Sequence, residues 1–416
     1  MCGMNGQRQV SFGLTGQFSP EKLAERYQAE LMDHLIPNLD EFVVDRQYGG
    51  FMCEFDIAAK TRLSTNKRAW YEGRGMWTYS FLFNRLDADD RYLTIATRSK
   101  DFILPHVPEG TGFFPASFTR DGSVISGEGD IFGNLYIAEG LLEYGRAISA
   151  PVYRTMGKDL IRKSLEVCLE SDYRYAPFKD VADGKFLNHW MVILWTASQA
   201  LAHEADPEMT RIIDQCIDYV LHRHLHPESG LLNDVWVPDR LATTDSGLDS
   251  CNFGIGIQLL WMMMYEAERR QDATLFLRAA RLFKYHVTVA KDEVYGGYLG
   301  YLSGIEDQRW RTDKILGLHE EILIGSLFLV EHLDDTWAKE CVEETFSYVQ
   351  HSFVKPGYAF WVSSGDRTLA AENRQRVEFY HHSRHLMLGL LSLRRIMKRK
   401  GRVSDFLANT ADINQI

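Results

Sequence analysis

The sequence predicts an all-α protein, an (α/α)6 barrel with short β-hairpins at one end. Two observations support this fold class. Segments rich in Gly, aromatic and alternating apolar residues recur six times, at a period of about 60 residues, and self-similarity at a fixed period is typical of repeat architectures. These segments alternate with pairs of long stretches in which apolar residues have helical spacing, so six units would contribute twelve helices.

The recurring segments are predicted to form the hairpins. Each is short, is bounded by Gly, Asp or Pro, and alternates apolar residues with other types, as expected for a pair of strands. In order, they begin at Tyr48, Gly112, Tyr175, Gly230, Gly296 and Gly357.

The stretch after each hairpin is predicted to be an inner helix. These stretches carry Trp, Met, Gly and Leu on all sides, and a helix that is hydrophobic all round is buried. The predicted inner helices are residues 69–86, 131–147, 187–201, 253–269, 315–333 and 380–397. The alternate stretches carry many charges and are expected to form the outer ring, for example residues 21–44, 208–225, 272–290 and 335–352.

The composition restricts the class of protein. The 46 Lys and Arg against 57 Asp and Glu give a net charge of −11, which argues against a general nucleic-acid binder. The chain contains neither a run of about 18 apolar residues nor a basic start followed by an apolar stretch, so neither a membrane partner nor a secretory signal is expected. The six cysteines are scattered without a CxxC pair. We therefore expect a cytoplasmic protein.

The domain organisation is expected to be simple, because no Pro/Ser-rich linker divides the chain. Residues 20–400 are predicted to form one barrel domain. They follow a flexible N-terminal segment, residues 1–19, and precede a C-terminal tail, residues 401–416.

Candidate functional residues are sought where the inner helices begin, because the hairpin loops gather at that end. The first inner helix places Arg74 among apolar and glycine neighbours, between Tyr71 and Trp77. A guanidinium that keeps its charge and presents fixed donors suits an anion or oxygen clamp. The alternative is a structural ion pair of Arg74 with Glu72 or Asp130.

The third inner helix opens with Asn188, His189 and Trp190. Asn188 and His189 could bind a ligand, but Asn188 could also cap the helix and His189 could be a buried core histidine. Aromatic residues at these openings, Trp190 among them, are more often core than binding platform. A barrel mouth lined by aromatic residues nevertheless suits a carbohydrate, because sugar rings stack on aromatic faces.

The fifth inner helix opens with His319, Glu320 and Glu321. One of the two carboxylates is expected to be buried with the histidine, and the other to be solvated or paired. A surface ion pair between Lys314 and Glu321 or its neighbour is the structural alternative.

The sixth inner helix places His381, His382, Arg384 and His385 within five positions. His381 and His385 have helical spacing for a metal site, but no acidic ligand lies near them in the sequence. Proton transfer is the favoured role, because histidine titrates near neutrality, and no metal or cofactor is expected. Arg384 lies three positions after His381 and could contact the same ligand.

In this order and spacing, these residues resemble the N-acylglucosamine 2-epimerase family, which is related to cellobiose 2-epimerases and to mannose and sulfoquinovose isomerases. The resemblance covers residues 48–395. The residues that carry it are Tyr48-Gly49-Gly50-Phe51, Arg74 with Trp77, Asn188 with Met191, Gly254 with Trp261, Lys314 with His319 and Glu321, and His381 with Arg384.

The resemblance implies an (α/α)6 barrel that acts on an open-chain sugar through an enediolate. It implies that His381 is the acid/base, that Arg74 contacts the sugar oxygens and that Glu321 is the acidic residue of the fifth helix. His319 is included as a further catalytic candidate.

The fourth inner helix departs from the family pattern Gly-His-x-x-Glu-x-x-Trp. The chain has Ile255 in place of the second histidine and Gln258 in place of the glutamate, and Val192 stands where some relatives have another histidine. Isoleucine cannot carry a proton, so aldose–ketose isomerisation is favoured over 2-epimerisation unless His189 or His319 reaches the opposite face of the sugar. Gln258 is retained as a binding candidate.

Two alternatives to this function remain open. One is a sugar-binding homologue that has lost catalysis. The other is a glycoside hydrolase, because (α/α)6 barrels host such enzymes and fold does not determine function. A small-molecule carbohydrate is the expected partner, and a homodimer is the default expectation for a soluble enzyme.

Overall fold

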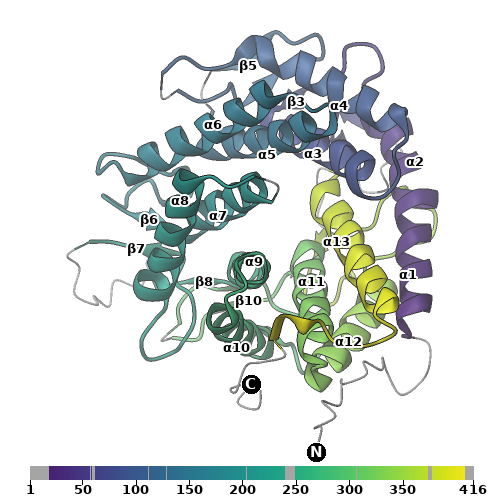
Figure 1. The fold of residues 1–416 in the computed structure, drawn as a ribbon, viewed down its shortest axis with the longest axis vertical. Helices are drawn as coiled ribbons and strands as arrows, with labels where there is room; N and C mark the ends of the chain where they lie inside the picture. The colour runs from purple at the N-terminus through teal and green to yellow at the C-terminus, as the bar shows by residue number, and fades with distance from the viewer. Residues whose placement is uncertain are drawn as a thin grey trace, which may run out of the picture.

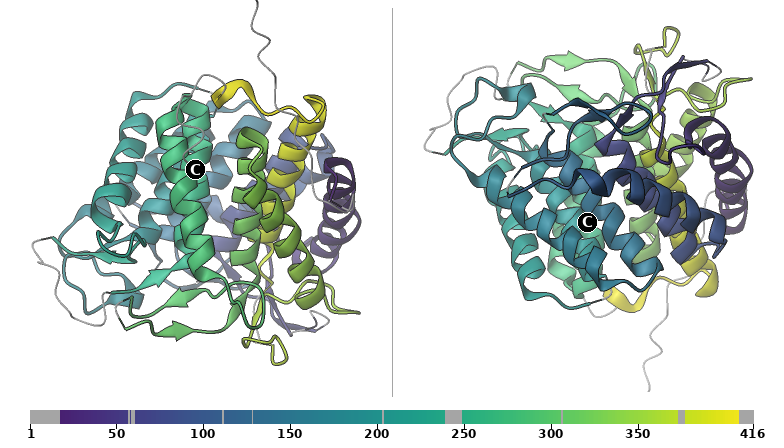
Figure 2. Two further views of the ribbon diagram at one scale, coloured as in Figure 1. Left: turned by 90° about the horizontal axis from the view of Figure 1, so that it is seen from below. Right: turned by 90° about the horizontal axis from the view of Figure 1, so that it is seen from above.

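Two rings of helices surround a central axis in the computed structural model of the chain (Figure 1). The structure describes residues 18–407 except 57, 59–60, 111, 128, 203, 239–248, 306 and 373–376. In this part of the chain, each inner helix contacts the next, and the last contacts the first, which closes the ring. The strands gather at one end (Figure 2). The predicted (α/α)6 barrel is confirmed.

The inner ring is buried almost all round, as its composition predicts. In α5, every residue from Ile131 to Gly145 is buried. The six inner helices are α3 (Ala69–Arg85), α5 (Ile131–Ala147), α7 (Leu187–Leu201), α9 (Phe253–Arg270), α11 (Leu316–Leu333) and α13 (Phe379–Lys398). These bounds lie within one or two residues of the predicted ranges.

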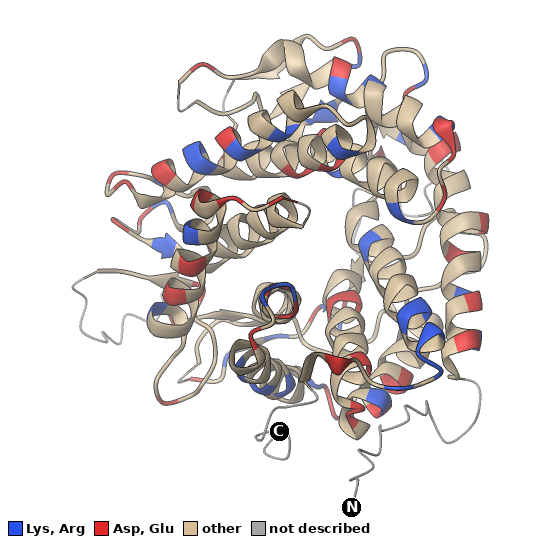
Figure 3. Cartoon of the chain, viewed as in Figure 1, with Lys and Arg blue, Asp and Glu red and all other residues tan. Residues whose placement is uncertain are grey.

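The outer ring carries more charged residues than the inner ring (Figure 3). Its helices are α4 (Asp90–Ile103), α6 (Pro151–Leu169), α8 (Pro207–Tyr219) continued by η5 (Val220–His224), α10 (Ala273–Ala290) and α12 (Thr336–Ser352). The sixth outer segment comes from the start of the described chain: α1 (Pro20–Ala29), η1 (Glu30–Leu35), α2 (Ile36–Asn38) and η2 (Leu39–Val43). Because α1 packs against α13, the first helix completes the last unit.

Side-chain caps define where most outer helices begin. An aspartate side chain accepts a backbone N–H at the start of four of them, which satisfies a donor that has no partner inside the helix. These residues are Asp89, Asp206, Asp272 and Asp335. Ser19 caps α1 in the same way.

The strands connect neighbouring units as well as forming local hairpins. The two-residue strands that precede inner helices pair antiparallel with a strand of the next unit: β3 (Lys67–Arg68) with β4 (Ser117–Phe118), β6 (Lys185–Phe186) with β7 (Val235–Trp236), β8 (Cys251–Asn252) with β9 (Tyr301–Leu302), and β11 (Lys314–Ile315) with β12 (Ser364–Gly365). Local pairs join β1 (Glu54–Phe55) to β2 (Arg62–Ser64), β4 to β5 (Val124–Ser126) and β9 to β10 (Trp310–Arg311). Single-turn helices η3 (Leu104–His106), η4 (Ala176–Phe178) and η6 (Asp405–Leu407) complete the fold.

Several smaller expectations can be compared with the described residues. None of the described helices is both long and apolar enough to span a membrane. The five cysteines in the described part of the chain form no disulfide, and Cys2 lies outside it. Residues 1–17 and 408–416 of the predicted termini also lie outside. Residues 401–407 pack on the barrel, where the Phe406 ring lies 5.4 Å from that of Phe276, so the proposed tail begins with an ordered segment.

An ion cluster at the strand end occurs twice with the same sequence spacing. In the first unit, Lys67 Nζ lies 3.0 Å from Asp45 Oδ2, and Arg120 donates to both oxygens of the same carboxylate. Burial alone would raise the pKa of Asp45, but the hydrogen bonds from Arg120 and Lys67 hold it well below its usual range.

The fifth unit repeats this cluster with Asp292, Lys314 and Arg367. Each lysine follows its aspartate by 22 residues and each arginine by 75. Lys314 Nζ lies 2.8 Å from Asp292 Oδ2, and both side chains are fully buried. The alternative pairing of Lys314 with Glu321 or its neighbour is therefore wrong, and Lys314 instead binds Asp292 and the Gly296 carbonyl oxygen of the turn that follows it.

We expect Lys314→Met to lower the free energy of unfolding by about 3 kcal/mol, because it leaves a buried carboxylate with one cation instead of two. Urea denaturation measures this change. The exposed Lys22→Met on α1 is the matched control and should alter stability by less than about 0.5 kcal/mol. A change in Lys314→Met no larger than in the control would contradict a structural role for the cluster.

Candidate active site

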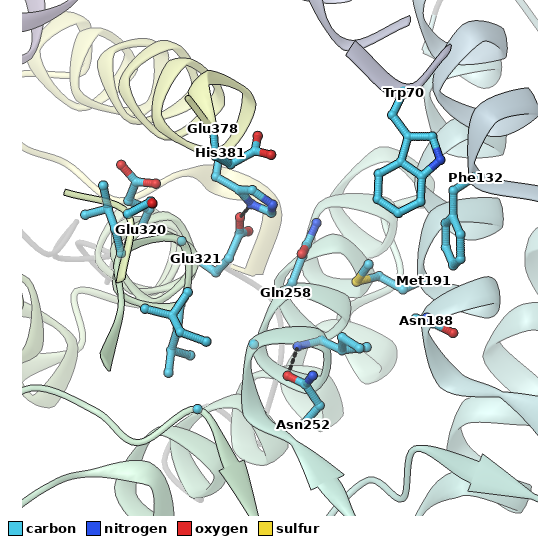
Figure 4. A pocket seen from close by; sticks show the side chains of 18 of the residues that line it. Trp70, Phe132, Asn188, Met191, Asn252, Gln258, Glu320, Glu321, Glu378 and His381 are labelled. Atoms are coloured by element: carbon cyan, nitrogen blue, oxygen red, sulfur yellow. Dashed lines mark hydrogen bonds and ion pairs between the residues drawn. The ribbon is translucent and has the colours of Figure 1, made fainter. Parts of the chain in front are cut away.

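A cavity of about 320 Å³ lies where the inner helices begin. It is lined by residues from the start of all six inner helices and from the adjacent strand-end loops. His381 and Glu321 lie on one side of the cavity, opposite Trp70, Phe132 and Met191 (Figure 4). The cavity therefore occupies the end of the barrel at which functional residues were sought.

His381 and Glu321 form the central polar contact of the cavity. His381 Nδ1 lies 2.7 Å from Glu321 Oε1, across the interface of α13 and α11 (Figure 4). The Glu321 side chain is 1% exposed and that of His381 is 22% exposed. An ionised Glu321 accepts a hydrogen bond from Nδ1–H, which leaves the lone pair on Nε2 as the one that can accept a proton.

Glu321 is held in the ionised state by two further donors. Arg384 Nη2 lies 2.5 Å from Oε1, and Trp261 Nε1 donates to Oε2 at 2.6 Å. Burial alone would raise the pKa of Glu321, but Arg384 and the hydrogen bond from His381 lower it to about 2. This carboxylate is charged at every pH near neutrality and fixes the tautomer of His381.

Arg384 lies behind Glu321 and Gln258. It is 1% exposed and does not line the cavity, although it was expected to contact a ligand. With its amide oxygen facing the guanidinium, Gln258 accepts from Arg384 at 2.7 and 3.1 Å. Gln258 lines the cavity as expected, and its orientation is set by Arg384.

Arg74 pairs with a residue that the sequence reading did not identify. Its Nη1 lies 2.7 Å from Glu378 Oε2, and its guanidinium carbon lies 4.1 Å from the centre of the Tyr136 ring. The suggested partners Glu72 and Asp130 are therefore wrong. Glu378 and Tyr136 line the cavity, whereas Arg74 lies directly behind them and is 5% exposed.

The wall formed by α9 contains no group that exchanges protons near neutrality. Its lining residues are Asn252, which caps the helix, and Gly254, Ile255 and Gln258. Ile255 is half-buried and lines the cavity at the position of the missing family histidine. Together with Phe132 and Met191, it makes this side of the cavity apolar.

Asn188 lines the cavity, but it does not cap α7. The N-cap of this helix is Phe186. The Asn188 amide instead donates to the hydroxyl of Tyr175 at 2.7 Å, and Tyr175 also lines the cavity. The structure thus adds Tyr175 to the polar groups available to a ligand.

Four other predicted binding residues do not line the cavity. Trp77 is fully buried against Phe81, and Tyr71 is buried against Phe379. The Trp190 ring stacks 4.1 Å from that of Tyr219. His189 is 1% exposed among aromatic rings, and burial lowers its pKa to about 3. The aromatic residues are core, and neutral His189 matches the core-histidine alternative.

His319 is also outside the cavity, and both of its ring nitrogens contact backbone groups. Nδ1 lies 2.8 Å from the Ile315 carbonyl oxygen, and Nε2 accepts the N–H of Tyr298 at 3.1 Å. Burial lowers its pKa to about 3. Glu72 holds the equivalent place in the first unit, five residues after its lysine, and accepts the N–H of Phe51 at 2.9 Å. A catalytic role for His319 does not fit this geometry.

The two carboxylates after His319 are both buried and both paired with other residues, so burial of one of them with His319 is wrong, whereas the salt-bridged alternative is the one that the structure shows. Glu321 pairs with His381, whereas Glu320 pairs with His382 at 2.5 Å. Because adjacent residues on a helix point in different directions, the two carboxylates contact different histidines.

The fold and the site together define an (α/α)6-barrel protein with a histidine–carboxylate pair in a cavity on the barrel axis. The family model for N-acylglucosamine 2-epimerase (GlcNAc 2-epimerase) matches residues 49–384. The chain belongs to this family. The resemblance noted in the sequence is therefore confirmed at the level of the family.

Individual relatives are more distant. The chain is 27% identical over 132 residues to a cellobiose 2-epimerase from Bacteroides fragilis, a stretch that covers 32% of this chain and 33% of the relative. The match thus spans about a third of the length of that curated relative.

Two solved structures share the fold at low sequence identity. A cellobiose 2-epimerase from Bacillus thermoamylovorans B4167 aligns with a TM-score of 0.79 at 14% identity, over 89% of this chain and 99% of that one. A D-mannose isomerase aligns with a TM-score of 0.74 at 13% identity, over 94% and 100% of the chains. At this identity the likeness establishes the architecture alone.

Proposed function

We propose that this chain is a sugar isomerase that interconverts an open-chain aldose and ketose through an enediolate, with His381 as the acid/base. The substrate is a monosaccharide or the reducing end of a disaccharide. The observation that carries the proposal is the contact of His381 Nδ1 with Glu321, which leaves Nε2 as the proton acceptor in a cavity of sugar size.

The proton transfer proceeds on one face of the sugar. Nε2 of His381 removes the proton from C2, and the electrons move to the carbonyl oxygen O1 to give the enediolate. The O2 hydroxyl proton passes to O1, and the same nitrogen returns the carbon-bound proton to C1 as the C2=O2 bond forms. The imidazolium that forms is stabilised by the charged Glu321. Polar groups beside the cavity, Gln258 and the Tyr175 hydroxyl, are placed to bind sugar hydroxyls.

The absence of a second base on α9 favours isomerisation over 2-epimerisation. Epimerisation requires a proton to be delivered to the opposite face of C2, and family members use a histidine where this chain has Ile255. Among the described lining residues, α9 contributes only apolar groups, glycine and amides. A single base acting between adjacent carbons needs no such partner.

Glycoside hydrolysis is not supported by the lining carboxylates. Glu320, Glu321 and Glu378 each lie within 2.7 Å of a histidine or arginine nitrogen. A hydrolase needs one protonated carboxylic acid opposite a carboxylate, and acids of this kind have raised pKa values. The pKa of Glu321 is lowered, so Glu321 does not fit the role of the protonated acid.

The test is product analysis by proton NMR after incubation with mannose, glucose, fructose, N-acetylmannosamine, N-acetylglucosamine and cellobiose. We expect ketose–aldose interconversion of at least one sugar, with the 2-epimer absent or minor. Sugar binding without turnover would support the binding-protein alternative, and release of reducing sugar from a glycoside would support a hydrolase; either result contradicts the proposal.

Restoring the histidine and the glutamate that the family pattern has at positions 255 and 258 should create 2-epimerase activity. We expect Ile255→His with Gln258→Glu to raise the ratio of 2-epimer to ketose by at least about tenfold, because the new histidine supplies a proton from the α9 wall. The added carboxylate would face Arg384, so its charge has a partner.

The matched control is Ile255→Asn, which makes the position polar but adds no group that titrates near neutrality. It should leave the product ratio unchanged. A folded double variant that forms no 2-epimer would contradict the assignment of Ile255 to the missing base.

A further inference from the structure

A second group of titratable side chains lies between α11 and α13, away from His381. It consists of Glu320, His382 and His385, which are buried and each offer one ligand atom within 4.8 Å of the others. Glu320 Oε1 lies 2.5 Å from His382 Nδ1 and 3.9 Å from His385 Nδ1. We propose that these three residues bind a divalent metal ion with the ligand preferences of zinc.

The first observation that points to a ligand is that His385 Nδ1 is buried without a hydrogen-bond partner among the described residues. The side chain is 1% exposed, and the separation of this nitrogen from Glu320 exceeds hydrogen-bonding distance. A buried polar atom without a partner is costly, and its orientation toward a carboxylate and a second imidazole is that of a metal ligand.

The outer contacts of both histidines are the second observation. His385 Nε2 lies 2.7 Å from the Tyr27 hydroxyl, and His382 Nε2 lies 3.4 Å from Glu30 Oε1. A bound ion would displace the proton between His382 Nδ1 and Glu320 Oε1, and with protons on the Nε2 atoms the Nδ1 lone pairs of both histidines would then face the ion. Metal-binding histidines characteristically donate their other N–H to such an outer partner, which fixes the tautomer and the ring orientation.

The ligand set determines the class of ion. Two imidazoles and one carboxylate are a common protein ligand set for Zn²⁺, which then takes a fourth ligand from solvent. A second cavity of about 260 Å³ is lined by His385, Tyr27 and Glu30 together with α12 residues such as Gln350, so it reaches one of the three ligand residues. The bound ion would link α11 and α13 to the first outer segment.

Sequence spacing pointed to a different pair. His381 and His385 were considered as a pair, but His381 lines the first cavity, whereas His385 is grouped with His382 one turn of α13 apart. The acidic ligand comes from α11, 62 residues before His382. The proposed metal site includes neither His381 nor Glu321, although Glu320 also lines the first cavity.

The test measures metal binding by tag-free full-length protein. After treatment with a chelator and exchange into metal-free buffer, the protein is incubated with ZnCl2, desalted and analysed by mass spectrometry for zinc per chain. We expect one zinc per chain and a rise in melting temperature of about 3–5 °C with added zinc. Cobalt should give the visible absorption of a tetrahedral site.

Variants distinguish this site from adventitious binding. His385→Gln and Glu320→Gln, checked for folding by circular dichroism, should each lower the retained zinc at least about tenfold, whereas the exposed His351→Gln should retain it. Either of two results would overturn the proposal: folded wild-type protein that retains no zinc, or variants that bind as much zinc as the wild type. In both cases Glu320 and His382 form only an ion pair.

Discussion

His381→Asn is expected to lower kcat by about 10³–10⁴-fold, because it removes the one group in the cavity that is placed to accept and return the substrate proton. Asparagine keeps a polar side chain at the position, so the melting temperature should change by less than about 2 °C. Turnover of the best sugar found in product analysis measures the first effect, and thermal unfolding measures the second.

The control for this variant is His222→Asn, on the outer segment η5. His222 is 58% exposed and hydrogen-bonded to Asp218, so its loss should leave kcat unchanged. If His381→Asn keeps more than a tenth of the wild-type kcat, His381 is not the acid/base and the proposed mechanism is wrong.

Glu321→Gln is expected to lower kcat by about 10³–10⁴-fold, although Glu321 is not the residue that accepts the substrate proton. An amide in this place no longer holds Nδ1–H of His381 in the required tautomer, and the equivalent change in a histidine–carboxylate pair of hydrolases has an effect of this size. The variant also leaves Arg384 buried without its counter-charge, which should lower the free energy of unfolding by about 3 kcal/mol.

A matched control separates lost stability from lost chemistry. Glu331, near the end of the same helix, is buried and pairs with Arg395 and Arg399 at 2.7 and 2.8 Å. It does not line the cavity. Glu331→Gln should therefore cost similar stability while kcat per folded molecule is retained. Equal losses of kcat in the two variants would show that Glu321 acts only through stability.

The architecture was predictable because the composition of the helices in every unit reflects how deeply they are buried. Inner helices that are apolar on all sides and outer helices with a charged face gave helix bounds within one or two residues, as for α5 and α7. The pairing between units was not predictable, because strands such as β6 and β11 are only two residues long and are too short for a period of two to be recognised in the sequence.

The site was predictable only in part. Helix starts identified His381 and Glu321 as candidates, and the structure brings them together across 60 residues. The same reasoning included Arg384 and Trp190, because a position in the first turns does not say which face of the helix points to the axis. Arg384 lies behind Glu321, and Trp190 packs toward the outer ring.

Glu378 was missed for a different reason. Glu378 is the N-cap of α13, and its side chain accepts the N–H of Tyr380 while pairing with Arg74. Its partner is more than 300 residues away in the sequence. A contact between residues so far apart in the sequence depends on how the ring of helices closes, and a local sequence pattern carries no information about that.

The most direct test of single-base chemistry at His381 is proton NMR of the substrate and products formed in deuterated water. We predict deuterium at one of the two C1 positions of the ketose and at C2 of the recovered aldose with its configuration retained, and no label with His381→Asn. Deuterium at C2 of an inverted aldose as the main product would contradict the account, because it requires a proton from the wall that contains Ile255.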